Sequence, residues 1–219
     1  QCNVPVYEFL PYMEQKKTYK EPVECNYPVE ELIPLLYGNI TVGTSTLGSS
    51  GVRVPGSAGE TTEALEEKYG IRSLIMADGP AGLRLRQSYQ VDKEHDTVYG
   101  TGVLGSLENG FLIPLENHEN ADTYYQYCTA FPVGTALAQT WDMALVKKFG
   151  QAIAEEMKEF QVDLWLAPGM NIQRNPLCGR NFEYFSEDPL LSGMMAVAVT
   201  QGVQSQSGCG VTIKHFSCN

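Results

Sequence analysis

The stretch that decides the fold is VDLWL (residues 162–166), an apolar run of strand length that a long polar loop follows. Asp188 then predicts the N-cap of a helix, because a carboxylate there can accept hydrogen bonds from the first free backbone N–H groups. Pro189 takes the first helical position, which proline favours, and we expect the helix to run to about Val203. VTIK (211–214) predicts the next strand. Strand, helix and strand in this order are typical of a parallel β-sheet.

The same alternation extends toward the N-terminus. SLIMA (73–77) predicts a buried strand, and FPVG (131–134) predicts a weaker one. Asp142 predicts the cap of a second long helix, whose apolar residues recur close to the 3.6-residue period. Short helices are expected at 29–37 and 61–69, and loops at 41–59, 87–122 and 168–187. The sequence therefore predicts an α/β fold with four strands.

Composition excludes several classes of ligand. The 219 residues carry a formal net charge of −11, which argues against nucleic acid and against anionic membrane surfaces as partners. No apolar run approaches the roughly 20 residues that span a bilayer. Residues 1–11 lack a basic segment followed by an apolar one, so no signal peptide is visible and a cytoplasmic location is expected.

Cysteine and histidine positions predict neither a disulfide framework nor a metal site. The six cysteines form no C-x-x-C pair, and the three histidines lie far apart in the sequence. In a chain of this size we expect reduced thiols and no metal. GTGVLG (100–105) matches G-x-G-x-x-G, but it neither follows a strand nor opens a helix, so it predicts a loop rather than a dinucleotide site.

Polar side chains follow three of the predicted strands. They are Asp78, the loop residues 171–180, and Lys214 with His215. In a parallel sheet the carboxyl ends of the strands meet on one face, so we expect these groups to converge there. Asp78 has two open interpretations: a turn-capping aspartate before glycine, or a carboxylate that accepts hydrogen bonds from ligand hydroxyls.

The long loop also has two interpretations. Arg180 and Glu183 can form an internal ion pair that holds the loop, or the loop can wall a polar pocket that offers donors and acceptors to a polyhydroxylated ligand. Its three aromatic residues can stack on sugar rings, although core packing is expected for at least one of them. Lys214 and His215 are neighbours in a strand, so both can face one pocket only if an irregular or cis peptide lies near them.

These residues resemble the signatures of a known family. DGPAGLR (78–84), NIQRNPLCGRNFEYFSEDPL (171–190) and KHFSCN (214–219) look like those of glycoside hydrolase family 3, the β-glucosidase type. The match runs from about Val54 to the end of the sequence. The resemblance implies a (β/α)8 barrel and hydrolysis of terminal β-D-glucosides with retention, through an Asp nucleophile and a separate acid/base Glu. It implies no metal or organic cofactor.

The resemblance also implies roles for individual residues. The group expected to bind the non-reducing sugar consists of Asp78, Arg84, Arg180, Lys214 and His215. Glu183 is expected to orient Arg180 rather than to touch substrate. KHF followed by SCN favours the glucosidase or xylosidase branch over the β-N-acetylglucosaminidase branch, which carries a catalytic His in a Gly-rich loop after Lys-His-Phe.

The sequence departs from a complete family member. No motif for the nucleophile or the acid/base is present, so both are expected outside this chain, and the isolated segment is expected to be inactive. A barrel typically takes about 250 residues. Residues 25–219 are too few for a whole barrel and predict its first four or so β/α units. Residues 1–24 are polar and show no clear period, so they predict a linker. The expected partners are a β-glucoside, the remaining barrel half and an accessory domain. The alternative is a non-catalytic sugar-binding half-barrel, or one that self-associates through its open sheet edge.

Overall fold

The computed structural model describes residues 28–39, 53–95, 97–99 and 117–217. The chain divides into two compact units, Gln1–Ile33 and Pro34–Asn219. The first unit contributes the helix α2 (Val29–Leu32), which the 3-10 helix η2 (Ile33–Leu36) follows. The helix expected at 29–37 is thus split, because proline at 34 offers no N–H for an α-helical bond. The predicted linker, 1–24, and GTGVLG lie outside the described residues.

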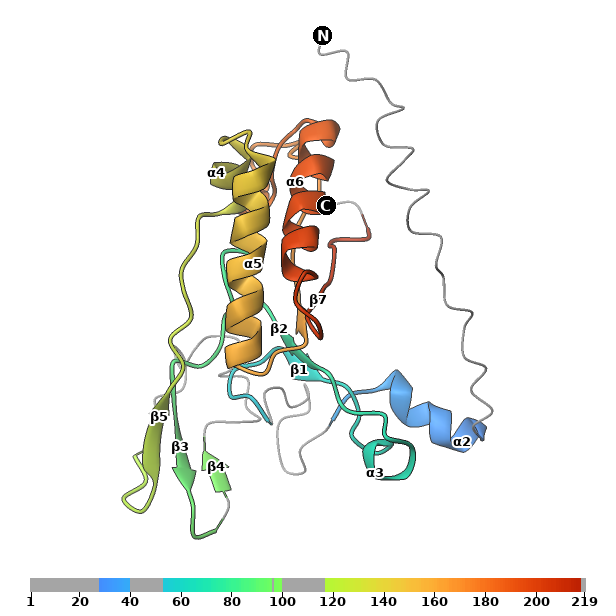
Figure 1. Cartoon of the computed structure of the whole chain (residues 1–219), viewed down its shortest axis with the longest axis vertical. Coiled ribbons are helices and arrows are strands. Elements are labelled where there is room, and N and C mark those ends of the chain that lie inside the picture. The colour runs from blue at the N-terminus through green and yellow to red at the C-terminus, as the bar shows by residue number, and fades with distance from the viewer. Residues whose placement is uncertain (1–27, 40–52, 96, 100–116, 218–219) are drawn as a thin grey trace. The chain divides into compact units, whose positions relative to one another are not determined.

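The second unit contains a four-stranded sheet in the order β1-β2-β6-β7 (Figure 1). Its strands are β1 (Gly59–Glu60), β2 (Ile75–Ala77), β6 (Leu164–Trp165) and β7 (Gly210–Val211). The pairs β2–β6 and β6–β7 are parallel, whereas β1 runs antiparallel to β2. Three strands were therefore predicted at the right places, although each is shorter than expected, and the architecture is α/β.

The predicted strand at 131–134 is wrong. This segment is not a strand, and the short helix α4 (Gly134–Ala138) begins at its last residue. Phe131 makes a single backbone bond, from its N–H to the carbonyl of Ala81 at 2.8 Å, and Pro132 has no N–H to donate to a ladder. The fourth strand is instead β1, which lies at the end of the stretch expected to be a loop.

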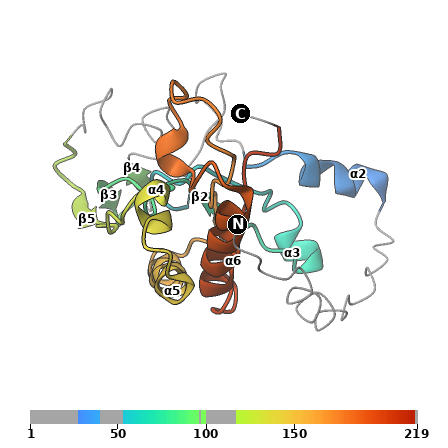
Figure 2. The ribbon, with the colours of Figure 1, turned by 90° about the horizontal axis from the view of Figure 1, so that it is seen from above.

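Two long helices cover the sheet and pack side by side (Figures 1 and 2). They are α5 (Met143–Glu159) and α6 (Pro189–Val203). Both predicted caps are confirmed: Asp142 accepts from the N–H groups of residues 144 and 145, and Asp188 accepts from those of residues 190 and 191. No helix among the described residues is long and apolar enough to cross a membrane.

The core lies between these helices and the sheet. Its fully buried side chains include Val146, Ile153, Met157, Trp165, Met195 and Val199. Trp165 also donates from Nε1 to the carbonyl of Gly79 at 2.7 Å, which ties β6 to the turn after β2. The core therefore fixes the strand ends from which the site is built.

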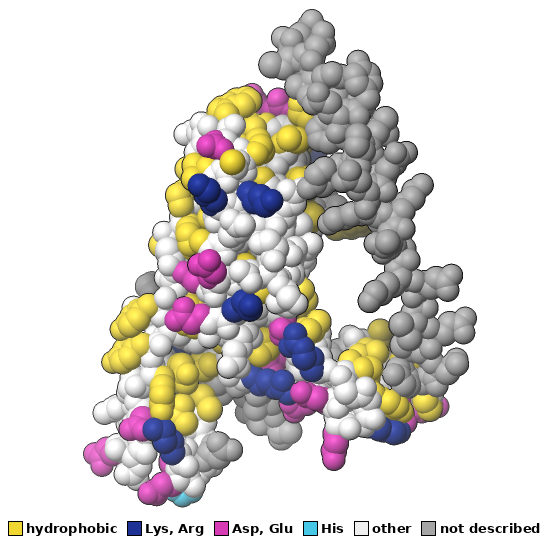
Figure 3. All heavy atoms as spheres, in the orientation of Figure 1, with side chains coloured by type: hydrophobic (Ala, Val, Ile, Leu, Met, Phe, Trp, Pro, Cys, Tyr) yellow, Lys and Arg dark blue, Asp and Glu magenta, His cyan; other side chains and the backbone are white. Residues whose placement is uncertain are grey.

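Two strands of a three-stranded antiparallel sheet lie within the stretch 87–122, which was expected to be a loop, and the third strand begins at its last residue, so that expectation is wrong. Its strands are β3 (Ser88–Asp92), β4 (Thr97–Tyr99) and β5 (Asp122–Tyr125), in the order β4-β3-β5. Tyr89 stacks on Tyr124 across the β3–β5 pair, with 5.7 Å between ring centroids. Hydrophobic side chains gather on this part of the surface (Figure 3), where Tyr125 is 61% exposed.

The helix expected at 61–69 is reduced to α3 (Glu66–Tyr69). It ends at Tyr69, the expected last residue, and Gly70 caps it with a φ of 66°, the left-handed conformation that glycine adopts without steric cost. The preceding residues instead extend the sheet edge, since the N–H of Thr61 donates to the carbonyl of Leu74 at 3.0 Å.

Candidate functional site

The loops that follow β2, β6 and β7 meet around a cavity of about 370 Å³. The predicted residues that line it are Asp78, Arg84, Arg180, Lys214 and His215. They come from segments as far as 136 residues apart in the sequence and reach one place because the three strands are parallel neighbours. The convergence expected at the carboxyl ends of the strands is thus what the structure shows.

Asp78 is the acceptor at the centre of this cluster. Its Oδ1 accepts from Lys214 Nζ at 3.2 Å, and its Oδ2 accepts from Arg84 at 2.8 Å. The carboxylate also accepts from the backbone N–H of Gly79. Asp78 therefore caps the turn before Gly79 and also lines the cavity, and its hydrogen bonds to ligand hydroxyls stay a prediction.

Two opposing effects set the pKa of Asp78. Burial is the largest and raises the pKa, but the charge and hydrogen bond of Lys214, the N–H of Gly79 and the charge of Arg84 together outweigh it. The pKa of Asp78 is therefore lowered from its ordinary value of 3.8. At neutral pH this group is an ionised acceptor between two cations.

We expect this lowered pKa to appear in a pH titration. An aspartate with a depressed folded-state pKa stabilises the fold above its unfolded-state pKa and loses that contribution as pH falls through the folded value. The carboxyl ¹³C resonance of Asp78 should titrate below 3.8, and Arg84→Gln should move its midpoint upward. A midpoint at or above 3.8 in the unmodified chain would show that the two cations do not hold the carboxylate.

Glu183 forms the buried base of the cluster. Its side chain is only 1% exposed, and it pairs with Arg180 on one side and with Lys214 Nζ at 3.6 Å on the other. The predicted Arg180–Glu183 ion pair is confirmed, and it raises the pKa of the Arg180 guanidinium. Glu183 therefore holds two of the cavity's cations, where the sequence predicted only one.

Glu183 belongs to the 3-10 helix η4 (Asn181–Glu183), which side-chain hydrogen bonds from two other residues hold in place. Gln173 Nε2 donates to the carbonyls of Asn181 at 2.8 Å and Tyr184 at 3.1 Å, and the Thr135 hydroxyl donates to the same two carbonyls. These bonds satisfy the backbone at both ends of η4, so the long loop is held by internal contacts as well as forming a cavity wall.

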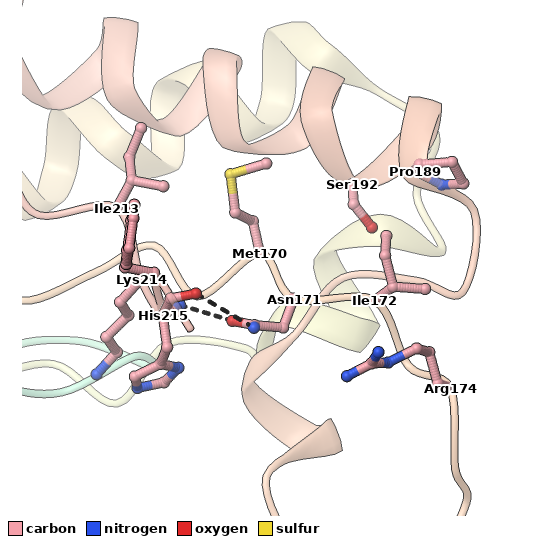
Figure 4. Close-up of a pocket in the computed structure, with 10 residues that line it drawn as sticks. Met170, Asn171, Ile172, Arg174, Pro189, Ser192, Ile213, Lys214 and His215 are labelled. Carbon is pink, nitrogen blue, oxygen red and sulfur yellow. Dashed lines mark hydrogen bonds between the residues drawn. The ribbon is translucent and has the colours of Figure 1, made fainter. Parts of the chain in front are cut away.

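Lys214 and His215 extend to the same side of the strand end (Figure 4). The peptide bond between them is cis, which is the departure from strand geometry that the sequence predicted for a shared pocket. The amide of Asn171 brackets His215: its Oδ1 accepts from the His215 N–H at 2.6 Å, and its Nδ2 donates to the His215 carbonyl at 3.3 Å.

The Nδ1 atom of His215 lies 2.9 Å from the hydroxyl oxygen of Tyr184. Burial lowers the pKa of His215 first, and the positive charges of Arg180 and Lys214 lower it further, against the opposing charges of Glu183 and Asp78. The imidazole is thus a neutral group at pH 7, able to donate from one nitrogen and accept at the other.

The loop aromatics divide between core and surface. Tyr184 and Phe185 are 1% and 4% exposed, whereas Phe182 is 51% exposed. Core packing is therefore confirmed for two of the three. Phe182 is the one that remains available at the surface of the loop.

A second cavity, of about 480 Å³, adjoins the first at the end of β7 (Figure 4). Lys214 and His215 line both cavities, and Met170 and Ile213 supply apolar wall. Ile213 is 55% exposed and Phe216 is fully exposed, so apolar surface follows β7 along the chain.

Sequence reasoning missed residues 56–58 and did not predict the contacts that Asn171 and Tyr184 make with His215. Residues 56–58 line the first cavity from the segment before β1, and Asn171 and Tyr184 position His215. Asn171 and Tyr184 lie inside the long loop motif, so their place in the motif was visible but their partner was not. Nothing in the sequence singles out residues 56–58.

Within the part of the chain that the structure describes, no three His, Cys, Asp or Glu side chains are grouped so that they could hold a metal. Cys128 and Cys209 are free thiols, Cys178 lies in the loop after β6, and burial is the largest effect raising the pKa of Cys128 to about 11. The other three cysteines lie outside the description. The ionisable groups of the cavity are carboxylates, cations and one imidazole.

Comparisons with known proteins show which family the chain resembles. Residues 111–219 match the Glycosyl hydrolase family 3 N terminal domain. The chain is 40% identical over 153 residues to a thermostable beta-glucosidase B from Acetivibrio thermocellus, covering 70% of this chain and 17% of that protein. It is 48% identical, with the same coverages, to an exo-alpha-(1->6)-L-arabinopyranosidase from Bifidobacterium breve.

Among solved structures, beta-glucosidase 3B from Thermotoga neapolitana in complex with alpha-D-glucose matches with a TM-score of 0.63 and 41% identity. The match covers 87% of this chain and 22% of that one. The chain spans about a sixth of the length of the curated relatives given above. With its cluster of cations around Asp78 and its long loop motif, the chain belongs to glycosyl hydrolase family 3.

Proposed function

We propose that this chain supplies most of the sugar-binding site of a retaining exo-glycosidase that removes terminal, non-reducing β-D-glucosyl residues. One observation carries the proposal: a carboxylate, three cations and an imidazole from three strand ends line one cavity of about 370 Å³. A sugar ring offers hydroxyls that both donate and accept, so it fits a site with both kinds of partner. The cavity volume is within the range of small-molecule sites.

We propose further that the reacting carboxyl groups come from outside these 219 residues. A retaining glycosidase needs two carboxyl groups about 5–5.5 Å apart across the scissile bond. Asp78 is held between two cations, and Glu183 is buried and paired with Arg180. Each is engaged in positioning, so neither suits the role of nucleophile or acid/base. The chemistry of such a pair needs water and no metal.

The fold supports the proposal that the described sheet is part of a (β/α)8 barrel. Strand β7 pairs on one side with β6, and no strand of the described residues pairs with its other side. Exposed Ile213 and Phe216 follow this strand in the chain. The next β/α unit of a longer parent chain would cover this surface. A non-catalytic half-barrel that self-associates would cover it with a second copy, and this is the competing proposal.

We expect the isolated chain to bind D-glucose without hydrolysing an aryl β-glucoside. Titration followed by NMR should move the resonances of Lys214 and His215, and Asp78→Asn should weaken binding by about tenfold, because a charge-assisted acceptor is lost. Tyr125→Phe, on the exposed antiparallel sheet, is the matched control and should bind like the unmodified chain.

Two outcomes would count against the proposal. Hydrolysis by the pure 219-residue chain would refute an external nucleophile. Absence of any glucose-dependent shift at the cavity, together with a concentration-dependent dimer in sedimentation, would favour the self-associating module. A panel of aryl glycosides tested on the parent protein, including α-L-arabinopyranoside, would decide which sugar it hydrolyses.

A cytoplasmic location stays a prediction.

A further inference from the structure

Tyr184 and His215 form a contact that the sugar-binding role does not by itself require. The Tyr184 hydroxyl lies 2.9 Å from His215 Nδ1, and the rings meet edge to face with centroids 5.9 Å apart. Tyr184 is 1% exposed, and its carbonyl is held by Gln173 and Thr135. The Tyr184 phenol is therefore fixed in the core, in contact with the imidazole of His215.

The backbone of His215 is fixed as well. The side chain of Asn171 makes one hydrogen bond to its N–H and one to its carbonyl. With the backbone held by Asn171 and Nδ1 held by Tyr184, the ring has one settled orientation. Nε2 is then the ring nitrogen left for the cavity that His215 lines.

The direction of the Tyr184–His215 bond decides what Nε2 can do. A neutral imidazole has one donor and one acceptor nitrogen, and the hydrogen bond at one nitrogen sets the role of the other. A phenol O–H is more acidic than an imidazole N–H, so the favoured arrangement has the phenol donating. We propose that Tyr184 donates to Nδ1 and thereby keeps the His215 proton on Nε2, making Tyr184 the positioning residue that presents an N–H donor to the substrate.

The surroundings are consistent with a neutral ring. The charged groups that face His215 are Arg180, Lys214, Glu183 and Asp78, and the two cations oppose a further positive charge. Burial acts in the same direction. This inference rests on the proposed function only in its last step, the donation from Nε2–H to a sugar hydroxyl oxygen. The tautomer itself can be measured without any sugar.

The first test is ¹⁵N NMR of the chain labelled at histidine. With three histidines in the sequence, His215 is assigned by the resonance that His215→Gln removes. We expect Nδ1 to resonate as an unprotonated, hydrogen-bonded nitrogen and Nε2 as a protonated one. Tyr184→Phe keeps the aromatic ring and removes the hydroxyl. It should narrow the difference between the ¹⁵N shifts of Nδ1 and Nε2. It should also raise the pKa of His215, because the neutral imidazole loses its hydrogen-bond donor. A protonated Nδ1 in the unmodified chain would overturn the proposal.

Tyr89→Phe is the control, since it removes a tyrosine hydroxyl from the antiparallel sheet and should leave the His215 resonances unchanged. The thermal midpoint of Tyr184→Phe separates positioning from simple packing. If the midpoint falls while both nitrogen shifts stay as in the unmodified chain, Tyr184 only packs and the proposal fails.

The second test compares two replacements of His215 in glucose binding. Glutamine places an amide N–H near the position of Nε2, whereas asparagine places one near Nδ1. We expect His215→Gln to retain binding within about threefold and His215→Asn to lose about tenfold, the effect of one hydrogen bond. Equal losses would count against donation from Nε2–H to the sugar and would overturn that last step of the proposal, whereas the tautomer that Tyr184 sets is decided by the first test.

Discussion

Replacing Lys214 with Met should weaken glucose binding by about 10- to 100-fold, the range expected for the loss of a charge-assisted donor. The ammonium lies 3.2 Å from Asp78 and 3.6 Å from Glu183, and only 14% of its side chain is exposed. Methionine keeps an unbranched side chain, one atom shorter than that of lysine, and removes the charge. The measurement is an NMR or calorimetric titration with D-glucose.

The same replacement should raise the pKa of Asp78, because burial raises this pKa and the ammonium of Lys214, which lowers it, would be gone. It should also lower the free energy of unfolding by about 1–3 kcal/mol, since a buried carboxylate loses a partner. Lys148→Met, at an exposed position of α5, is the matched control and should change neither quantity. Unchanged glucose binding in Lys214→Met would remove this residue from the proposed site.

Replacing Gly202 with Ala should destabilise the fold by about 2–3 kcal/mol, the usual cost of overpacking. Helices α5 and α6 approach so closely here that a Cβ at Gly202 would lie 2.2 Å from the Lys147 carbonyl oxygen and 2.8 Å from the Gly150 Cα. Both neighbours are backbone, so no side-chain rotation can relieve the contact. Chemical denaturation is the measurement.

Gly193 supplies the control within the same helix. A Cβ there meets nothing within 4 Å, so Gly193→Ala should stabilise the fold by about 0.5–1 kcal/mol through helix propensity. The two substitutions are chemically identical and should have opposite signs. A neutral Gly202→Ala would show that the helices can move apart at little cost, and that the close approach does not determine their packing.

Local chemistry explains which elements could be predicted. Asp142 and Asp188 precede apolar-periodic stretches and accept the N–H bonds that begin α5 and α6. Gly70 ends α3 in the left-handed conformation that few other residues adopt. These features involve neighbours within four residues, so the sequence alone is sufficient to locate them.

The missed elements depend on distant partners. Buried positions of β3 include Gln90, whose amide nitrogen donates to Asn117 and Thr123, so the strand lacks the apolar alternation that usually marks one. At 131–134 the apolar run resembled a strand, but Gly134 lies against η4, where a Cβ would be 2.6 Å from the Glu183 carbonyl oxygen. Such contacts have no signal in a local window of sequence.

The sequence by itself determined the helix caps, the three parallel strands and the identity of the groups at their carboxyl ends, because each follows from residues close together in the chain. Only the tertiary structure decided that Lys214 joins Asp78 to Glu183, and that Tyr184 and Asn171 hold His215. These pairs span between 31 and 136 residues. Burial and charge act through space, so the packing of the loops around the strand ends sets which of these groups meet.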